Sequence, residues 1–194
     1  MLAGNSKIYG IPYDSNSVMI IDPATDTADI VTITGLSGDK KWGGGMLADG
    51  KIYGIPYSAT EVLIVDPTTD TSDITTITGL SGSRKWSGGV LASNGNIYTI
   101  PHSTTTVLII EPSTDTVDLS VISGLSSSPE KWAGSYLAGS NGKIYGISYT
   151  ADSVLIINPN ADTADTSTGT GLSSSSEMWM GGVLAGNGKI YGIP

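Results

Sequence analysis

Cysteine and phenylalanine are absent from this chain of 194 residues, and histidine occurs only once, as His102. Without cysteine there are no disulfides, and neither a thiol nucleophile nor the usual set of zinc ligands can be assembled. A Ser-His-Asp arrangement would depend on the single imidazole of His102, which stands beside serine and threonine residues. We therefore expect no enzymatic activity, no metal site and no cofactor.

Positive charge is also scarce, because nine Lys and Arg residues stand against 18 Asp and Glu residues and leave a net charge of -9. Proteins that bind nucleic acids or anionic membranes use clustered Lys and Arg, so neither is an expected partner. No apolar run reaches the roughly 18 residues of a membrane span. The first residues carry neither a basic leader nor a hydrophobic stretch. These observations predict a soluble chain without a signal peptide or transmembrane segment, in a compartment that the sequence does not indicate.

Repetition is the most informative feature that the chain does have. A unit that opens with KIYGIPYDSNSVMIIDPATDT in its first copy recurs with starts 44 to 47 residues apart. A period in this range is typical of supersecondary units that bury their apolar faces only against copies of themselves. Because no change of composition interrupts the copies, we expect residues 1–194 to form a single domain. The copies start at Lys7, Lys51, Asn96 and Lys143, and a partial copy starts at Lys189.

Each unit contains four short segments with the composition of strands, separated by Gly, Pro, Asn, Asp and Ser. One segment is continuously apolar, which suits a strand buried on both faces, and one is rich in threonine, as expected of an outer strand. No segment keeps a helical period without interruption. An all-β chain of four-stranded antiparallel units repeated about four times is predicted to be a β-propeller. Around the second copy, the expected strands are Lys51–Tyr57, Glu61–Asp66, Asp73–Thr78 and Gly89–Ala92.

The unit resembles the kelch and WD-type propeller repeats, because NGKIYGI precedes SVLIIDPxTDT much as a "kIYv" strand precedes a strand ending in "yDP" in kelch repeats. Two features differ from kelch repeats: Ile-Pro follows Tyr-Gly where a Gly pair is usual, and tryptophan precedes the glycine-rich strand. The order KWxGG before that strand and NGxIYxI after it is similar to the tachylectin type of lectin propeller. The resemblance covers the whole chain and implies a propeller fold, with sugar binding if the lectin type applies.

The two ends of the chain, MLAGNSKIYGIP and VLAGNGKIYGIP, are nearly the same fragment of a blade. Both cannot fill one position, and we expect first that a single chain closes into a four-bladed ring with one fragment left over. Alternatively, the surplus hairpin completes a blade of a second chain, which would give a symmetric homo-oligomer such as an eight-bladed ring, or the chain is part of a longer array. Burying Ile190, Tyr191 and Ile193 would contribute about 1.5 to 3 kcal/mol per side chain. The C-terminal fragment is therefore expected to join a sheet.

Aromatic residues recur at two fixed positions of the repeat, one after the second strand and one before the glycine-rich strand. A four-stranded meander places both positions on one face of the propeller. Aromatic faces stack on C–H surfaces while their polar tips form hydrogen bonds, so a ring of such side chains suits a sugar or a peptide. A tryptophan repeated once per blade also commonly packs between blades, so both roles remain open. The candidate ligand-binding residues are Tyr13, Tyr57, His102, Tyr149, Trp42, Trp86, Trp132, Trp179, Lys41, Lys85 and Lys131.

Acidic residues gather in the turns expected at the opposite face. Carboxylate oxygens suit calcium, but their order lacks the pattern of the EF-hand calcium loop, and Asp before Pro is ordinary turn chemistry. We therefore expect no metal in these turns. The turn residues are Asp22, Asp26 and Asp29, then Asp66, Asp70 and Asp73, then Glu111, Asp115 and Asp118, and finally Asn158, Asp162 and Asp165.

Taken together, these features favour a non-enzymatic β-propeller scaffold that presents repeated loops on one face to a protein or a glycan. One alternative is a multivalent lectin with a weak site on each blade. Another is an amplified or designed repeat protein with no evolved ligand. A propeller enzyme would need unequal blades with distinct catalytic loops, whereas these copies are nearly equal.

Overall fold

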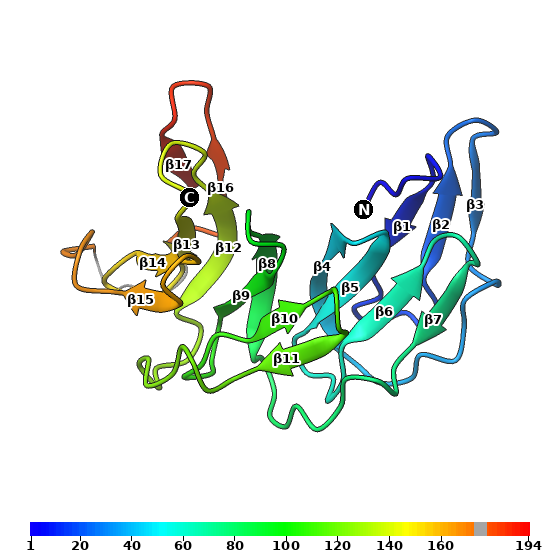
Figure 1. Ribbon diagram of the computed structural model, residues 1–194, viewed down its shortest axis with the longest axis horizontal. Helices are drawn as coiled ribbons and strands as arrows, with labels where there is room; N and C mark the ends of the chain where they lie inside the picture. Colours follow the sequence, from blue (N-terminus) through cyan, green and yellow to red (C-terminus); the bar gives the residue numbers. More distant parts are fainter. Residues whose placement is uncertain (173–177) are drawn as a thin grey trace.

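The computed structural model describes residues 1–172 and 178–194, and all the regular structure in these residues is β-strand, as the sequence predicts. The strands form five antiparallel sheets, here called blades 1 to 5 in chain order, in which consecutive strands pair (Figure 1). Blades 2, 3 and 4 have four strands each. Their strands are β4 (Trp42–Ala48), β5 (Lys51–Pro56), β6 (Leu63–Asp66) and β7 (Thr71–Asp73); β8 (Trp86–Leu91), β9 (Ile97–Pro101), β10 (Ile109–Glu111) and β11 (Thr116–Asp118); and β12 (Trp132–Leu137), β13 (Ile144–Ser148), β14 (Leu155–Asn158) and β15 (Thr163–Asp165).

The first and last sheets contain fewer strands than a complete blade. Blade 1 lacks the glycine-rich first strand, and blade 5 has only the first two strands of the pattern. Blade 1 consists of β1 (Ile8–Gly10), β2 (Met19–Asp22) and β3 (Thr27–Asp29), and blade 5 consists of β16 (Gly181–Leu184) and β17 (Ile190–Ile193).

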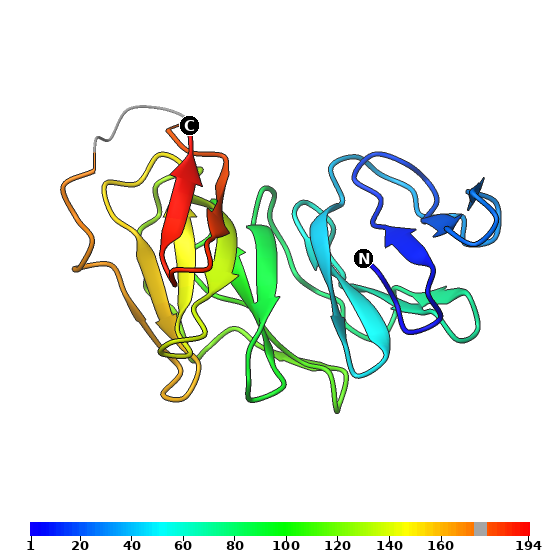
Figure 2. The same ribbon diagram turned by 90° about the horizontal axis from the view of Figure 1, so that it is seen from above.

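The blades stand side by side along an arc, with the first strands of consecutive blades next to each other (Figures 1 and 2). Glycine in these first strands permits the close approach: a Cβ on Gly45 would lie 2.8 Å from a side-chain carbon of Ile11 in the preceding blade. Three apolar cores fill the spaces between blades 1 and 2, 2 and 3, and 3 and 4. The predicted propeller architecture of four-stranded antiparallel blades is therefore confirmed.

The predicted four-bladed ring is not closed. Blades 1 and 5 are separate sheets at opposite ends of the arc (Figure 2). Each copy of the KIYGIP segment stays in a hairpin of its own chain end, because β1 pairs with β2 and β17 pairs with β16. The two terminal copies therefore belong to different sheets, and neither takes the place of the other in a shared blade. The assignment of residues 1–194 to one domain stays a prediction.

The predicted outer strand Asp73–Thr78 is wrong, because β7 ends at Asp73. The Asp73 carboxylate accepts hydrogen bonds from the backbone amides of Thr75 (2.6 Å) and Thr76 (3.2 Å), which turns the chain out of the sheet. The first strand is longer than predicted, since β8 begins at Trp86 and contains an irregularity before Gly89. The continuously apolar strand is confirmed, because β6 is buried up to Val65. Asn141-Gly142 lies in the turn between the paired strands β12 and β13, where Gly142 has a φ of 67°. Within the described residues, no helix is long and apolar enough to cross a membrane.

Candidate functional site

Four aromatic side chains from four blades form a continuous row on one face of the arc. Each follows the second strand of the four-stranded pattern, which is β1 in blade 1, at the end of the blade opposite the acidic turns (the Asp turns). The ring centroids of Tyr13 and Tyr57 are 5.7 Å apart, those of Tyr57 and His102 are 5.4 Å apart, and those of His102 and Tyr149 are 6.1 Å apart. Tyr13, Tyr57, His102 and Tyr149 are called the aromatic row below.

Backbone hydrogen bonds fix the spacing of the row. The Lys41 amide donates to the Tyr13 carbonyl (2.8 Å), and the Lys41 carbonyl accepts from the Tyr57 amide (2.8 Å). The same two bonds recur through Lys85 and Lys131, at 2.7 to 2.8 Å, and the series ends where Met178 donates to Tyr149 at 2.9 Å. The two repeated positions singled out in the sequence therefore lie side by side on one face, as the meander topology predicts.

Exposure differs along the row. Tyr13 is 40% exposed, Tyr57 and Tyr149 are half-buried, and His102 is only 7% exposed. Burial lowers the pKa of His102 below its ordinary value, so the imidazole is neutral near pH 7, and burial raises the pKa of the Tyr57 phenol. A ligand on this face would meet three phenols and one largely buried, neutral imidazole.

A charged pair lies beside the row. Arg84 Nη1 and Glu130 Oε1 are 2.6 Å apart. The residue after each ring anchors the neighbouring loop: Asp14 accepts a hydrogen bond from the Lys40 amide (2.7 Å), and Ser103 Oγ accepts one from the Glu130 amide (3.1 Å). The face thus combines apolar rings with fixed hydrogen-bonding groups, which is the usual composition of a recognition surface.

Three of the four predicted tryptophans are buried between blades. Trp42, Trp86 and Trp132 are 1 to 2% exposed, and the indole of Trp86 donates to the Thr106 carbonyl at 2.9 Å. These side chains belong to the interblade cores, so packing rather than ligand contact explains their recurrence. Trp179 differs, because it is half-buried and lines an open cavity in blade 5.

The predicted lysines are buried as well. Lys41, Lys85 and Lys131 are at most 3% exposed. The ammonium group of Lys85 donates to the carbonyls of Ala59 (2.7 Å) and Gly82 (3.0 Å) and lies 5.7 Å from the centroid of the Trp86 ring. Burial lowers the pKa of Lys85 and of Lys131 to about 8. These lysines hold the loops beneath the row. Of the predicted residues, Tyr13, Tyr57, Tyr149 and Trp179 remain accessible.

The Asp turns hold a contact that sequence reasoning missed. The phenol of Tyr53 in blade 2 donates to Asp115 in blade 3 at 2.6 Å, and Lys51 donates to the other carboxylate oxygen at 2.6 Å. Tyr9 with Asp70 and Tyr98 with Asp162 repeat this contact. We call it the interblade clasp. Among the described residues no group of three His, Asp or Glu side chains could hold a metal ion.

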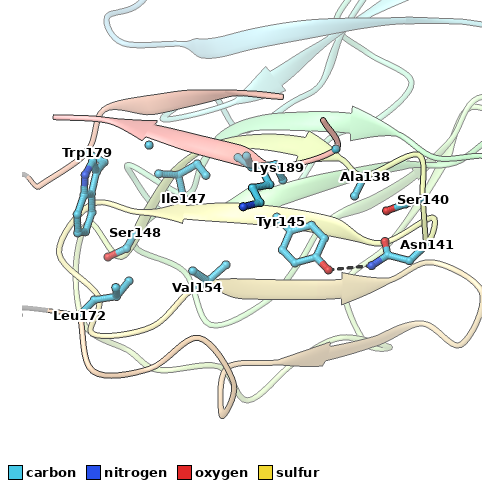
Figure 3. Close-up of a pocket in the computed structure, with 13 residues that line it drawn as sticks. Ala138, Ser140, Asn141, Tyr145, Ile147, Ser148, Val154, Leu172, Trp179 and Lys189 are labelled. Atoms are coloured by element: carbon cyan, nitrogen blue, oxygen red, sulfur yellow. Dashed lines mark hydrogen bonds between the residues drawn. The ribbon is translucent and has the colours of Figure 1, made fainter. Parts of the chain in front are cut away.

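A cavity of about 640 Å³ lies at the other end of the molecule from Tyr13, between blade 4 and blade 5. Figure 3 shows Trp179 at one end of it and Tyr145, hydrogen-bonded to Asn141 at 2.9 Å, at the other. Its walls are mostly apolar and include Ile147 and Val154. The aromatic row and this cavity are the two surfaces that could receive a ligand or a partner.

No protein-family model and no curated protein matches this chain. Solved structures do share its fold. Virginiamycin B lyase from Staphylococcus aureus matches with a TM-score of 0.70 at 11% identity, over 100% of this chain and 68% of the lyase. Hydrazine synthase from Kuenenia stuttgartiensis matches with a TM-score of 0.70 at 13% identity, over 97% of this chain and 52% of that protein. The extracellular domain of BT4673 from B. thetaiotaomicron matches with a TM-score of 0.66 at 11% identity, over 93% of this chain and 24% of that one.

These structures are β-propeller-like repeat folds. The chain spans between a quarter and two thirds of their lengths. At such low identity the similarity shows the fold alone.

Proposed function

We propose that this chain is a non-enzymatic scaffold that recognises a protein or a glycan through the aromatic row. The observation that supports this most is the continuity of the row: rings from four blades follow one another at 5.4 to 6.1 Å. One extended ligand could therefore contact several blades at once. Phenol faces stack on the C–H surfaces of sugars and on apolar side chains, and phenol hydroxyls supply hydrogen bonds.

Recognition fits the row better than catalysis does. His102 is the only histidine of the chain, it is 7% exposed, and its Nδ1 lies 3.2 Å from the hydroxyl of the adjacent Ser103. That hydroxyl already accepts a hydrogen bond from the Glu130 amide. It therefore holds the neighbouring loop in place and is not presented to a substrate. Virginiamycin B lyase shows that the fold can carry an enzyme, but this row has the composition of a binding surface.

A multivalent lectin is the second candidate. The tyrosines of the row occupy the same position in different blades, so each blade could offer an equivalent weak site, and linked sites raise overall affinity without new contacts. The tachylectin-like order of KWxGG and NGxIYxI in the sequence supports this version.

The test is a glycan array together with a panel of displayed peptides, screened with the unaltered chain and with Tyr57→Ala and Tyr149→Ala. We expect a ligand whose binding both variants weaken at least about tenfold, as loss of an aromatic contact does. Tyr191→Ala is the matched control, because Tyr191 is 47% exposed and lies in blade 5, away from the row. Tyr57→Phe would then separate stacking from hydrogen bonding by the phenol.

Thermal unfolding of the same variants shows whether they remain folded. A ligand that the row variants still bind as tightly as the unaltered chain would contradict the proposal. A blank array and a blank peptide panel would favour the repeat protein without an evolved ligand.

A further inference from the structure

The cavity in blade 5 lies where the third strand of that blade would be. In a complete blade the third strand pairs with the second and covers the preceding blade: β6 pairs with β5, and its Leu63 joins the core shared with blade 1. Blade 5 stops at β17, and the cavity is lined on one side by Ile190 and Gly192 of β17 and on the other by Tyr145 and Val154 of blade 4 (Figure 3).

The face of blade 4 that borders this cavity is incompletely covered. Tyr145, Val154 and Ile156 are partly exposed, whereas the equivalent residues of the other blades are at most 6% exposed. The equivalent residues are Tyr9, Val18 and Ile20 in blade 1, Tyr53, Val62 and Ile64 in blade 2, and Tyr98, Val107 and Ile109 in blade 3.

Blade 1 exposes the complementary half of the same interface. Ile8 is 37% exposed and Met19 is 41% exposed, whereas their equivalents in blade 2, Ile52 and Leu63, are completely buried against blade 1. The uncovered face of blade 4 and the uncovered face of blade 1 are thus the two sides of a contact that the chain forms three times internally.

The polar groups at the two ends match in the same way. Blade 4 carries the donor half of an interblade clasp, with Tyr145 already oriented by Asn141 and with Lys143 two residues before it. Blade 1 carries the acceptor half at Asp26, whose φ of 53° equals that of Asp70, the acceptor for Tyr9. Asp26 is exposed, and among the described residues its carboxylate has no ion-pair or hydrogen-bond partner.

We propose that a second copy of this chain docks its blade 1 against blade 4 of the first and joins β16 to form a hybrid four-stranded blade. Tyr145 and Lys143 of the first copy then bond Asp26 of the second, while Met19 and Ile21 of the second copy fill the cavity. The charge pairing is the same as that of Lys51 with Asp115 inside the chain.

Strand β17 of the first copy and residues 1–3 of the second copy are the segments that are displaced. Strand β17 presents Tyr191 and Ile193 largely to solvent, at 47% and 54% exposure, so its release uncovers little. By contrast, Tyr9 of β1 is fully buried and already clasped to Asp70.

In the chain itself Leu2 lies opposite Ile8, and Met1 and Ala3 form backbone hydrogen bonds with Tyr9 and Lys7, so these first residues must also leave the edge of β1. Because KIYGIP is the same sequence in β1 and β17, β1 of the second copy then offers β16 the same partners, with Ile8 opposite Leu184 in place of Ile190.

The contact is heterologous, because each copy uses a different surface at each end, and such contacts close into rings or continue as filaments. Two copies close into a ring of eight blades: three complete ones from each copy and two hybrids. In the closed ring, β17 and residues 1–3 are the displaced segments and the sheets at both ends of each copy are complete, which favours the closed form over a growing filament.

Disulfide trapping tests the proposal directly, because the chain has no cysteine of its own. Residues opposite each other in an antiparallel pair have Cα atoms about 4.5 to 5.5 Å apart, within the range of a disulfide. The variant Ile8→Cys with Leu184→Cys should give a covalent dimer on oxidation. The matched control, Leu184→Cys with Ile190→Cys, locks β17 onto β16 within one chain and should give monomers when oxidised and dimers when reduced.

Light scattering on the unaltered chain should show twice the mass of one chain, falling toward one chain on dilution. Asp26→Ala should weaken the dimer about tenfold or more, since it removes the carboxylate that accepts the Tyr145 hydrogen bond and pairs with Lys143. Asp39→Ala removes an exposed carboxylate at the other end of the blades and should leave the dimer unchanged. A mass of one chain at every concentration, or a variant with both Ile8→Cys and Leu184→Cys that folds but does not cross-link, would overturn the proposal.

Discussion

The hydroxyl of Tyr53 lies 2.6 Å from the carboxylate of Asp115, although 62 residues and one blade boundary separate the two side chains. The same hydroxyl lies 3.2 Å from the carbonyl oxygen of Pro112, and Lys51 neutralises the carboxylate from the other side. Equivalent contacts join blades 1 to 2 and 3 to 4. Three of the acidic turns, through Asp70, Asp115 and Asp162, therefore hold neighbouring blades together.

Replacing Tyr53 by Phe should reduce the free energy of unfolding by about 1.5 to 3 kcal/mol, because a buried hydrogen bond to a charged group is lost. Urea unfolding measures the change. Tyr191→Phe is the control and should change the free energy by less than about 0.5 kcal/mol, since Tyr191 is exposed at the end of the arc. A double-mutant cycle with Asp115→Ala should show coupling, and simple additivity of the two losses would contradict the clasp.

The clasp also predicts a loss of stability at alkaline pH. Burial, and then the hydrogen bond to Asp162, raise the pKa of Tyr98 to about 12. Tyrosines of the unfolded chain ionise near 10, so the folded state retains the proton to higher pH than the unfolded state does. The contribution of Tyr98 to stability is therefore fully present below about pH 10 and is lost between about pH 10 and 12.

Ultraviolet titration of phenolate, followed together with circular dichroism, measures this effect. We expect a subset of the nine tyrosines to ionise only as the chain unfolds, and Tyr98→Phe to reduce that subset. Ionisation of all tyrosines together near pH 10 in a folded chain would contradict the prediction.

The turn that ends each outer strand predicts a dependence on acid. Hydrogen bonds from the Thr76 hydroxyl and the Thr75 amide lower the pKa of Asp73 to about 2. Because this pKa lies below the unfolded value near 3.9, the stabilisation is complete above about pH 4 and is lost as the pH falls toward about 2. Urea midpoints at several pH values should decline over that range and should decline less in Asp73→Asn. If Asp73→Asn and Asp39→Asn show the same pH profile as the unaltered chain, the turn does not act in this way.

Much of the fold follows from local signals in the sequence. The apolar run from Val62 to Val65 indicates a strand buried on both faces, and Asn-Gly pairs indicate the hairpins, because both depend on neighbouring residues only. The predicted outer strand Asp73–Thr78 is wrong for a physical reason. Thr75 and Thr76 favour strands by propensity, but the Asp73 side chain captures their amides and ends β7.

The relation between blades is harder to derive, because the repeat determines each blade but not the angle between blades or the state of the ends. The aromatic row could be predicted from topology, since Tyr57 and Lys41 occupy fixed positions in the meander. The burial of Lys41 could not, because it depends on how closely the next blade packs. For Trp42 the sequence left packing and ligand contact both open, and the interblade core decides for packing. The interblade clasp joins residues more than one repeat apart in the sequence, such as Tyr53 and Asp115, so no local sequence pattern predicts it.

The two kinds of tryptophan in the repeat should respond differently to the same substitution. Trp86 is 1% exposed in the core between blades 2 and 3, so Trp86→Ala leaves a large cavity and an unpaired Thr106 carbonyl. We expect a loss of about 3 to 5 kcal/mol in the free energy of unfolding. Trp179 is half-buried beside the open cavity, and Trp179→Ala should cost about 1 kcal/mol in dilute solution, as for a partly exposed side chain. Chemical unfolding of both variants measures the difference, and equal losses would mean that blade 5 is packed as tightly as the complete blades.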